Sequence, residues 1–476
     1  MSTLLALLQT SGNALGVFEQ ALNVVENNVN NSSTPGYATQ SLNLEAQPLN
    51  VEDGLTGGVA SGGLSDSRDP YAEEQVQQQT QALGFYTAQA QTTSSIQSLF
   101  NVSGSNGISS ALSSLFQAFS AWSTTPGDAT AGQTVIDDAG DVATAVQDLS
   151  SSLSQEAQQV HSSISSTVSQ INTIASQIQA YNTERLKEPT PDPAEEAQLY
   201  SSLDNLSQLT NFTTVTQSDG TVTVLLSGGS PLVMGTQQYS LSAGFSVDAN
   251  AANPNSPPTA HIYDSQGDDI TSQITGGQLG GLLDSANRVL ASVIGDSQQT
   301  GTLNQLAATL ASTVNQILES GTVSTTAGAA NGSALFTYDT TNATNAAASL
   351  VVNPSITTDE LAPVDSSGNA NGNANTLAAL ESTTLSALGG VSLTSYFGQI
   401  ASAMGQENQN ATDNEQTQQQ VVASATTLVN NASGVSLDAQ AVNVMQFQRA
   451  YQSVAQVLTA LNNMVEDVLA LVQPNP

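Results

Sequence analysis

The side chains that could carry out chemistry are few in this sequence. It contains no cysteine and only two histidines, His161 and His261, which lie far apart in the chain. Without cysteine, neither a disulfide framework nor a thiolate metal site can form. His161 stands in a helical segment, beside its apolar stripe rather than on it. We therefore interpret His161 as a solvated residue of a helix surface and not as a ligand or a general base.

Two short motifs resemble ligand loops without matching them. Three aspartates in YDSQGDDI (Asp264, Asp268 and Asp269) offer calcium ligands, but their spacing departs from the twelve-residue pattern that ends in glutamate. The glycines of 276–281 precede a helix, but no lysine follows in the position that a phosphate loop requires. We predict turns at both places. The sequence predicts no catalytic residue, no metal and no cofactor, and therefore no enzyme.

The charge balance excludes several classes of partner. Five basic residues face forty acidic ones, which gives a formal net charge of −35. Nucleic acid binding needs Lys and Arg on the phosphates, so we predict none. No stretch reaches the roughly 18 apolar residues of a membrane span, and the apolar start lacks the basic region of a cleaved signal peptide. The sequence thus predicts no membrane insertion, and any export would have to use a route without a cleaved signal.

The two ends of the chain are the elements most able to position an interaction site. Both carry apolar residues at alternating spacings of three and four, which is typical of a helix packed on another helix. The residues expected at an assembly interface are Leu4, Leu8, Leu15, Phe18, Leu22 and Val25 near the start, and Leu437, Val444, Phe447, Tyr451, Val454, Leu458, Leu461 and Val465 near the end. A terminal helix paired only with the other terminus would be marginal. We therefore expect these stripes to be buried between subunits.

Between the ends, the pattern predicts long helices around a smaller β-rich part. Helical spacing covers about 72–100, 108–122, 130–181, 280–318, 377–388 and 396–431. Residues 212–226 alternate around Ser218-Asp219-Gly220, a hairpin signal, and 40–65 suits short extended segments. The predicted fold class is mainly α with a β-rich insertion. Its terminal helices pair as a coiled coil, its long helices form a bundle, and a small β domain lies centrally.

This pattern divides the chain into three expected domains. A terminal coiled-coil assembly domain combines 1–45 with 432–476. A helical bundle combines 46–200 with 277–320 and 396–431. A β-rich outer domain combines 201–276 with 321–395.

Motifs at both ends resemble those of the axial proteins of the bacterial flagellum. The Asn-rich end of the first helix runs into Thr34-Pro35-Gly36-Tyr37, and the last helix contains Gln446-Phe447-Gln448-Arg449-Ala450-Tyr451-Gln452. Internal segments, among them Ser67-Arg68-Asp69-Pro70-Tyr71, resemble the hook-associated protein 1 family, and the resemblance spans nearly the whole chain. The sequence departs from that pattern at Ala38-Thr39 and at Ala439-Gln440, which thins the charge at the expected interfaces.

The resemblance implies a structural subunit that joins the flagellar hook to the filament. It implies export through the type III export apparatus with an export chaperone, and a location outside the cell at the hook–filament junction. It also implies termini that fold on assembly, with Tyr37 and the two stripes at the interface. The implied partners are other copies in a ring, the flagellar hook protein and a second junction protein.

Two alternatives remain open from the sequence. Another axial protein of the hook or rod would carry the same terminal motifs, but the coiled-coil pattern of the middle argues against a hook protein. An unrelated acidic secreted protein, such as a peptidoglycan hydrolase, would need a cluster of carboxylates or histidines in a cleft. The sequence does not provide such a cluster.

Overall fold

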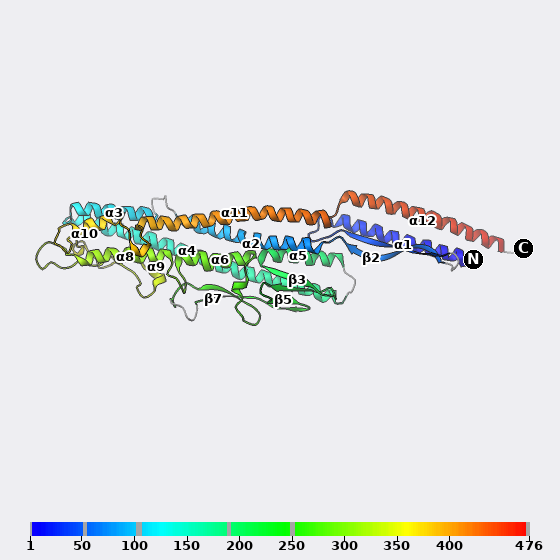
Figure 1. Ribbon diagram of the computed structural model, residues 1–476, viewed down its shortest axis with the longest axis horizontal. Helices are drawn as coiled ribbons and strands as arrows, with labels where there is room; N and C mark the ends of the chain where they lie inside the picture. The colour runs from blue at the N-terminus through cyan, green and yellow to red at the C-terminus, as the bar shows by residue number, and fades with distance from the viewer. Residues whose placement is uncertain (1, 51–54, 101–106, 188–191, 248–252, 473–476) are drawn as a thin grey trace.

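The chain forms a long rod in the computed structural model (Figure 1). The structure describes residues 2–50, 55–100, 107–187, 192–247 and 253–472. Both termini lie at one end of the rod, and the segment around α10 (Gly372–Ala379) lies at the other (Figure 1). The predicted fold class, mainly α with β-rich parts and paired terminal helices, is confirmed.

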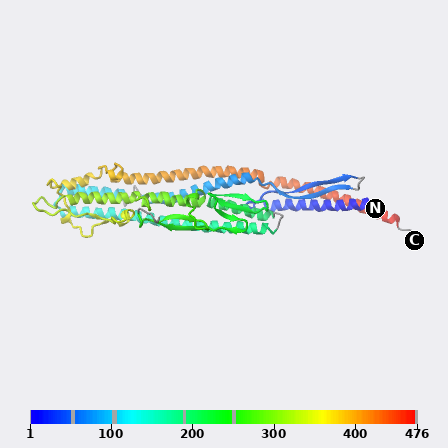
Figure 2. The ribbon, with the colours of Figure 1, turned by 60° about the horizontal axis from the view of Figure 1, so that its bottom comes forward.

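The terminal end consists of two helices and one hairpin. Helix α1 (Ser2–Asn30) and helix α12 (Leu437–Val472) lie side by side and run in opposite directions (Figure 1). Strands β1 (Gln40–Asn50) and β2 (Leu55–Asp66) form an antiparallel hairpin that lies along α1 (Figure 2). The hairpin fits the extended segments predicted over 40–65.

The rest of the rod is built on long helices. These are α2 (Pro70–Leu99), α3 (Ile108–Thr124), α4 (Ala129–Arg185), α5 (Pro193–Leu209) and α11 (Leu393–Ser433). Helix α11 packs along α2, and α4 packs on α3 and α5. The 57 residues of α4 span about 85 Å at 1.5 Å per residue.

The apolar stripe of α4 explains why the rod is stable. Its core side chains follow spacings of four and seven, and they are fully covered. They are Val135, Val142, Val146, Leu153, Val160, Ile164, Ile171 and Ile178, each at most 2% exposed. They join the aromatic side chains of α3, where Phe116, Phe119 and Trp122 are equally buried. This core is complete within one chain.

Aspartates start several of the helices. The side chains of Asp69, Asp128 and Asp192 accept hydrogen bonds from the first backbone N–H groups of α2, α4 and α5. Proline follows directly in α2 and α5, where its missing N–H costs nothing. Helix α5 was not predicted from the sequence, although Asp192-Pro193 is a helix start of this kind.

The single helix expected over 280–318 is wrong, because the chain breaks in the middle. It forms α6 (Gly277–Asp284), a π-helical turn (Ser285–Leu290), α7 (Ala291–Ile294) and then α8 (Thr302–Ser320). Gly295 and Gly301 both have φ of 85°, and a Cβ on Gly301 would lie 2.3 Å from the Gly295 nitrogen. Such an approach requires glycine.

The central strands lie along α4 and are fixed to it by asparagine side chains. Strands β3 (Phe212–Thr216), β4 (Val222–Leu226), β5 (Pro231–Met234) and β6 (Gln237–Gln238) form one antiparallel sheet, and β7 (Ser242–Ser246) pairs with β8 (Thr259–Tyr263). The predicted hairpin at Asp219-Gly220 joins β3 to β4. Asn182 of α4 accepts from the Val222 N–H (2.8 Å) and donates to the Val222 carbonyl (2.8 Å).

The far end of the rod contains short elements packed on α8 and α4. They are β9 (Phe336–Thr337), a 3-10 turn (Ala343–Asn345), α9 (Ala346–Ser349), β10 (Val351–Val352), further 3-10 turns (Thr358–Glu360 and Ser386–Leu388) and α10. One more 3-10 turn (Thr271–Gln273) lies beside β8. The strands of 212–263 therefore lie along the middle of the rod, while most of 321–395 lies towards its tip (Figure 1). The division into three domains stays a prediction.

Candidate assembly surface at the chain ends

Helices α1 and α12 pack on each other but leave much of each apolar stripe uncovered. Among the predicted residues, Val25 is buried, whereas Leu437 and Tyr451 are 55% and 37% exposed. The others are half-buried: Leu4, Leu8, Leu15, Phe18, Leu22, Tyr37, Val444, Phe447, Val454, Leu458, Leu461 and Val465. Two helices and one hairpin therefore do not suffice to cover these side chains.

The fully buried face of α1 lies beside the predicted stripe. It consists of the smaller residues Ala14, Val17 and Ala21, together with Asn28, and it shares only Val25 with the stripe. The β1–β2 hairpin packs on α1, and it comes so close that a Cβ on Gly58 would lie 2.5 Å from the Thr10 methyl group. The spacing of Ala14, Val17 and Ala21 was a signal for this face, but the larger apolar residues beside it dominated the pattern.

Asn28 joins the three elements of the terminal end. Its side-chain oxygen accepts from the Tyr37 hydroxyl (2.9 Å) and from the Gln40 N–H (2.9 Å). Its amide donates to the Gln40 carbonyl (2.8 Å) and to Oε1 of Gln440 on α12 (3.3 Å). Asn28 and Gln440 are 1% and 3% exposed, so these hydrogen bonds are shielded from water. Burial also raises the pKa of the Tyr37 hydroxyl, which keeps it a donor.

The end of α11 is tied to the base of the hairpin. The Thr39 N–H donates to the Ser433 carbonyl (2.9 Å), and the Thr39 hydroxyl donates to the Gly434 carbonyl (2.9 Å). Ser67 and Ser433 exchange hydroxyl-to-carbonyl bonds of 3.2 Å in both directions. The break between α11 and α12 is thus held beside both ends of the hairpin.

Arg68 connects this terminal end to the rod. Its guanidinium donates to Glu73 on α2 (2.8 Å) and to the carbonyl of Gly36 (2.6 Å), and it lies 3.5 Å from the ring centroid of Tyr200 on α5. The Arg68 and Glu73 side chains are only 6% and 11% exposed. Gly36 has φ of 74°, and a Cβ there would lie 2.3 Å from the Ala197 carbonyl oxygen of α5. The TPGY turn therefore needs its glycine in order to reach Arg68.

The region around Arg68, Gly36, Glu73 and Tyr200 is the joint between the terminal end and the rod, and several acidic groups lie close together in it. Burial raises the pKa of Glu73 even though Arg68 opposes the shift. Burial and the neighbouring Asp66 raise the pKa of Glu196. Burial raises the pKa of Asp204 to about 6, and its Oδ1 has no hydrogen-bond partner among the described residues. The carboxylates at the joint thus outnumber the nearby arginines, Arg68 and Arg185.

Comparison with known families decides between the flagellar alternatives. The family "Flagellar hook-associated protein FlgK helical domain" matches residues 93–336, just over half of the chain. The chain belongs to the flagellar hook-associated protein FlgK family. The resemblance inferred from the terminal motifs is confirmed. Two further families match the ends: "Flagella basal body rod protein" over 8–37 and "Flagellar basal body rod FlgEFG protein C-terminal" over 429–471.

Relatives in the FlgK family align with part of the chain. Flagellar hook-associated protein 1 of Bacillus subtilis (strain 168) is 27% identical over 184 residues, which cover 37% of this chain and 36% of that protein. The protein of the same name from Salmonella typhimurium is 26% identical over 291 residues, 58% of this chain and 51% of that one. The chain thus spans about half or less of the length of these relatives. A solved structure, the flagellar hook junction protein FlgK from Burkholderia pseudomallei, is 27% identical, with a TM-score of 0.45 over 55% of this chain and 46% of that one.

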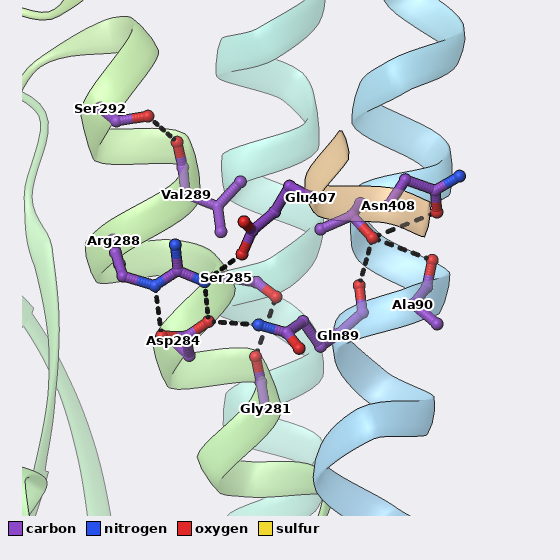
Figure 3. Close-up of polar contacts among 11 residues, drawn as sticks. Gln89, Ala90, Gly281, Asp284, Ser285, Arg288, Val289, Ser292, Glu407 and Asn408 are labelled. Carbon is purple, nitrogen blue, oxygen red and sulfur yellow. Dashed lines mark hydrogen bonds and ion pairs between the residues drawn. The ribbon is translucent and has the colours of Figure 1, made fainter. Parts of the chain in front are cut away.

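A polar network lies within the rod, away from the chain ends. Arg288, on the π-helical turn, holds Asp284 with two hydrogen bonds of 2.7 and 2.8 Å and also binds Glu407 of α11 (Figure 3). Gln89 of α2 donates to the same Asp284 (2.8 Å). Both carboxylates, Asp284 and Glu407, bind the one guanidinium of Arg288, so we interpret the network as a clamp that holds α6 against α2 and α11.

His161 and the aspartate motif of 264–269 make contacts that stabilise the fold. His161 is half-buried against the Phe245 ring, with 4.4 Å between ring centroids, and desolvation lowers its pKa. The expectation of a solvated histidine is therefore wrong, because β7 folds over that part of α4. Asp264 accepts the backbone N–H groups of Gln266 and Asp268, as expected of a turn. Among the described residues, no group of three His, Cys, Asp or Glu side chains could hold a metal.

The glycines of 276–281 pack on protein backbone. A Cβ on Gly277 would lie 2.2 Å from the Thr210 nitrogen, and one on Gly281 would lie 2.3 Å from the Phe85 carbonyl oxygen. They allow α6 to enter between α2 and α5, which fits the predicted helix entry. Within the described ranges, no helix has the length and apolar content that crossing a bilayer would need.

Proposed function

We propose that this chain is a structural subunit of the bacterial flagellum that joins hook to filament and assembles in a ring through its terminal helices. The observation that carries the proposal is the half-covered apolar stripe on each terminal helix. Both stripes face solvent in part, although α1 and α12 already pack on each other. Membership of the FlgK family supports the same role. The proposed role is structural, not enzymatic.

Energetics supports burial of these stripes between copies. Ordering a residue costs about 1–2 kcal/mol in backbone entropy, and burying an apolar side chain returns about 1.5–3 kcal/mol. A helix whose stripe is only half covered gains little net stability from its partners within the chain. Contacts with neighbouring copies would supply the missing burial. We therefore propose that the terminal helices become fully ordered only on assembly.

The partners follow from the proposed position in the flagellum. The ring would contact the flagellar hook protein on one side and a second junction protein on the other. The subunit would leave the cell through the type III export apparatus with an export chaperone and act outside the cell. A hook or rod protein is the alternative, and the match of the FlgK helical domain over 93–336 favours the junction role.

Two charged substitutions test the assembly interface. Leu22→Asp and Tyr451→Asp place a carboxylate on the two stripes, and we expect folded monomers that are absent from isolated flagella. Asn23→Asp and Gln452→Asp are matched controls, because each adds the same group to an exposed neighbouring position. Circular dichroism reports the fold, and mass spectrometry of sheared hook–filament complexes reports incorporation. Unfolding of the Leu22→Asp or Tyr451→Asp monomer would argue against an interface between copies.

Hydrogen exchange tests the ordering step. In the purified monomer we expect residues 2–35 and 437–472 to exchange faster than α4. Equal protection at the ends and in α4 would mean that the coiled coil is complete in one molecule, and the proposed ordering on assembly would be wrong.

A further inference from the structure

Asp204 of α5 is a buried carboxylate that lies beside a second one. Its Oδ1 is shielded from water and has no hydrogen-bond partner among the described residues. The Gln77 side chain of α2 forms a hydrogen bond with the Asp204 carboxylate, and the charge of Glu73, one helical turn before Gln77, also acts on it. Glu73 and Gln77 are both buried. Two carboxylates thus lie close together in the interface between α2 and α5, where water does little to weaken their repulsion.

The arginine of the joint is bound to other groups. The Arg68 guanidinium donates to Glu73 (2.8 Å) and to the Gly36 carbonyl (2.6 Å), and it lies 3.5 Å from the ring centroid of Tyr200. A buried carboxylate oxygen that no donor reaches is more stable as the neutral acid. Burial and Glu73 raise the pKa of Asp204 to about 6, although Gln77 and Arg68 oppose the shift, and this agrees with the geometry.

The other elements beside Asp204 contribute uncharged side chains. Asp204 lines a groove between α2, α5, α6 and α11, where α11 contributes Val422 and Thr426 and α6 contributes Gln278. Asp204 is the one titratable group among the described residues that line this groove. The charged groups where α4 meets α5 lie beside the first turn of α5, and they are Glu184, Arg185, Glu195 and Glu196. The charges that act on Asp204 are therefore those of Glu73 and Arg68.

The turns of α5 before Asp204 hold the terminal end. Tyr200 lies against the Arg68 guanidinium, and a Cβ on Gly36 would lie 2.3 Å from the Ala197 carbonyl oxygen. Ala197, Tyr200 and Asp204 follow one another at spacings of three and four, so they share one face of α5. The helix is 17 residues long and continuous. A displacement of α5 at Asp204 therefore also displaces the surfaces that receive Arg68 and Gly36.

We propose that Asp204 is a pH-dependent switch that sets how firmly the joint holds the terminal end on the rod. When Asp204 ionises, it and Glu73 place two negative charges beside one guanidinium, and their repulsion favours movement of α5 away from α2. That movement separates Tyr200 from Arg68. The inference goes beyond the proposed function and does not depend on it, because all of these contacts lie within one chain.

The firm state of the joint belongs to acid pH. In the open joint Asp204 has its ordinary pKa of 3.8, whereas in the closed joint its pKa is about 6. A group whose pKa is raised in the closed state stabilises that state fully below the lower value, and this stabilisation is lost as the pH rises through the higher value. The open fraction of the joint should therefore increase up to about pH 7 and stay constant above it.

Hydrogen exchange of the purified full-length chain tests the switch. The exchange rate of residues 197–207 in the natural chain is divided by the rate in Asp204→Asn at the same pH, which removes the intrinsic pH dependence of exchange. We expect this ratio to rise about tenfold between pH 5 and pH 7.5 and to stay level up to pH 8.5. With the exposed Asp148→Asn as the matched control, the same ratio should not change with pH.

Two outcomes of this experiment would overturn the switch. One is a ratio for Asp204→Asn that is independent of pH. The other is an equal rise of the ratio in α4, for example over residues 146–164, because Asp204 would then act on the stability of the whole rod and not on the joint.

Trypsin tests whether the switch reaches the terminal end. Cleavage after Arg68 requires an open joint, because the Arg68 side chain is 6% exposed, and its rate follows the open fraction when opening is fast. At pH 7.5 we expect Asp204→Asn to be cut at Arg68 about tenfold more slowly than the natural chain. Cleavage after Lys187, whose side chain is 62% exposed, should be equal in the two proteins. An equal rate at Arg68 in both proteins would overturn the link between Asp204 and the terminal end.

Discussion

The rod and the terminal end use the same kind of apolar stripe in different ways. In α4, Ile164, Ile171 and Ile178 are not exposed at all, because other helices of the rod and the central strands pack on this helix. In α1 and α12 the corresponding side chains are only half covered. A heptad pattern therefore says that a helix packs on something, but it does not say whether the partner belongs to the same chain.

The joint between these regions is built differently from both. It depends on buried polar groups, with Arg68, Glu73 and the Gly36 carbonyl inside and carboxylates around them. Hydrogen bonds between charged groups are directional and fix geometry better than apolar contacts do. The joint can therefore hold the terminal end in line with the rod while the terminal stripes stay available to other copies.

The largest expected difference between the rod and the terminal end is the unfolding free energy lost when a phenylalanine in each is replaced by alanine. Phe119 is fully buried in the rod, and Phe119→Ala should cost about 3–5 kcal/mol of unfolding free energy because it leaves a cavity. Phe18 is half-buried in α1, and Phe18→Ala should cost the monomer about 1 kcal/mol or less. Trp122, the only tryptophan, is buried in the same core as Phe119 and reports rod unfolding by its fluorescence in urea. Similar losses for the two variants would contradict the comparison.

The joint should be nearly as sensitive as the core. Arg68→Ala leaves Glu73 buried without its partner, which should cost about 3 kcal/mol. Lys187→Ala is the matched control, because the Lys187–Glu184 pair is solvent-exposed and its loss should have no measurable effect. Urea midpoints at pH 7 compare the two. The cost of Arg68→Ala should also shrink at low pH, where Glu73 becomes protonated.

The sequence predicted those helices and turns that are determined by residues close together along the chain. The stripes of α1, α4 and α12 repeat over many turns, so these helices and their pairing could be predicted. The hairpin at Asp219-Gly220 was equally clear from its turn residues. The TPGY turn pointed to the region where Asn28, Tyr37 and Gly36 meet.

What depends on distant contacts could not be predicted in this way. The buried face of α1 lies beside the strongest stripe because α12 and the hairpin both pack on this helix, and nothing in residues 2–30 encodes where they lie. Arg68 stands in a quoted motif, but its contacts Gly36, Glu73 and Tyr200 come from three separate segments. The break at Gly295 and Gly301 was missed because apolar spacing resumes at Leu303 on the other side.

Within the terminal end, Asn28 should matter more than its neighbours. Asn28→Ala removes four hydrogen bonds and leaves Gln40 and Gln440 buried without this partner, which should cost about 2 kcal/mol locally. Hydrogen exchange of the assembled protein measures it as faster exchange at the Gln40 amide, with α4 unchanged. The exposed Asn30→Ala is the control. Loss of protection in α4 as well would mean that the two regions unfold as one unit.

The smallest expected effect concerns Asp204 at the joint and depends on pH. Burial raises the pKa of Asp204 from its ordinary 3.8 to about 6, so the folded state keeps a proton that the unfolded chain has already lost. The favourable contribution is fully present below pH 3.8 and is lost as the pH rises to about 6. Asp204→Asn stays neutral at every pH and should therefore stabilise the chain at pH 7–8 by about 1–2 kcal/mol, with no gain below about pH 4.

Urea midpoints of Asp204→Asn across that pH range measure the effect. The exposed Asp148→Asn serves as the matched control and should change nothing. A gain that is independent of pH would mean that the carboxylate of Asp204 is destabilising through packing and not through its charge. The joint would then owe its sensitivity to Arg68 and Glu73 alone, and the rod and the terminal end would be coupled by that one ion pair rather than by the balance of charges around it.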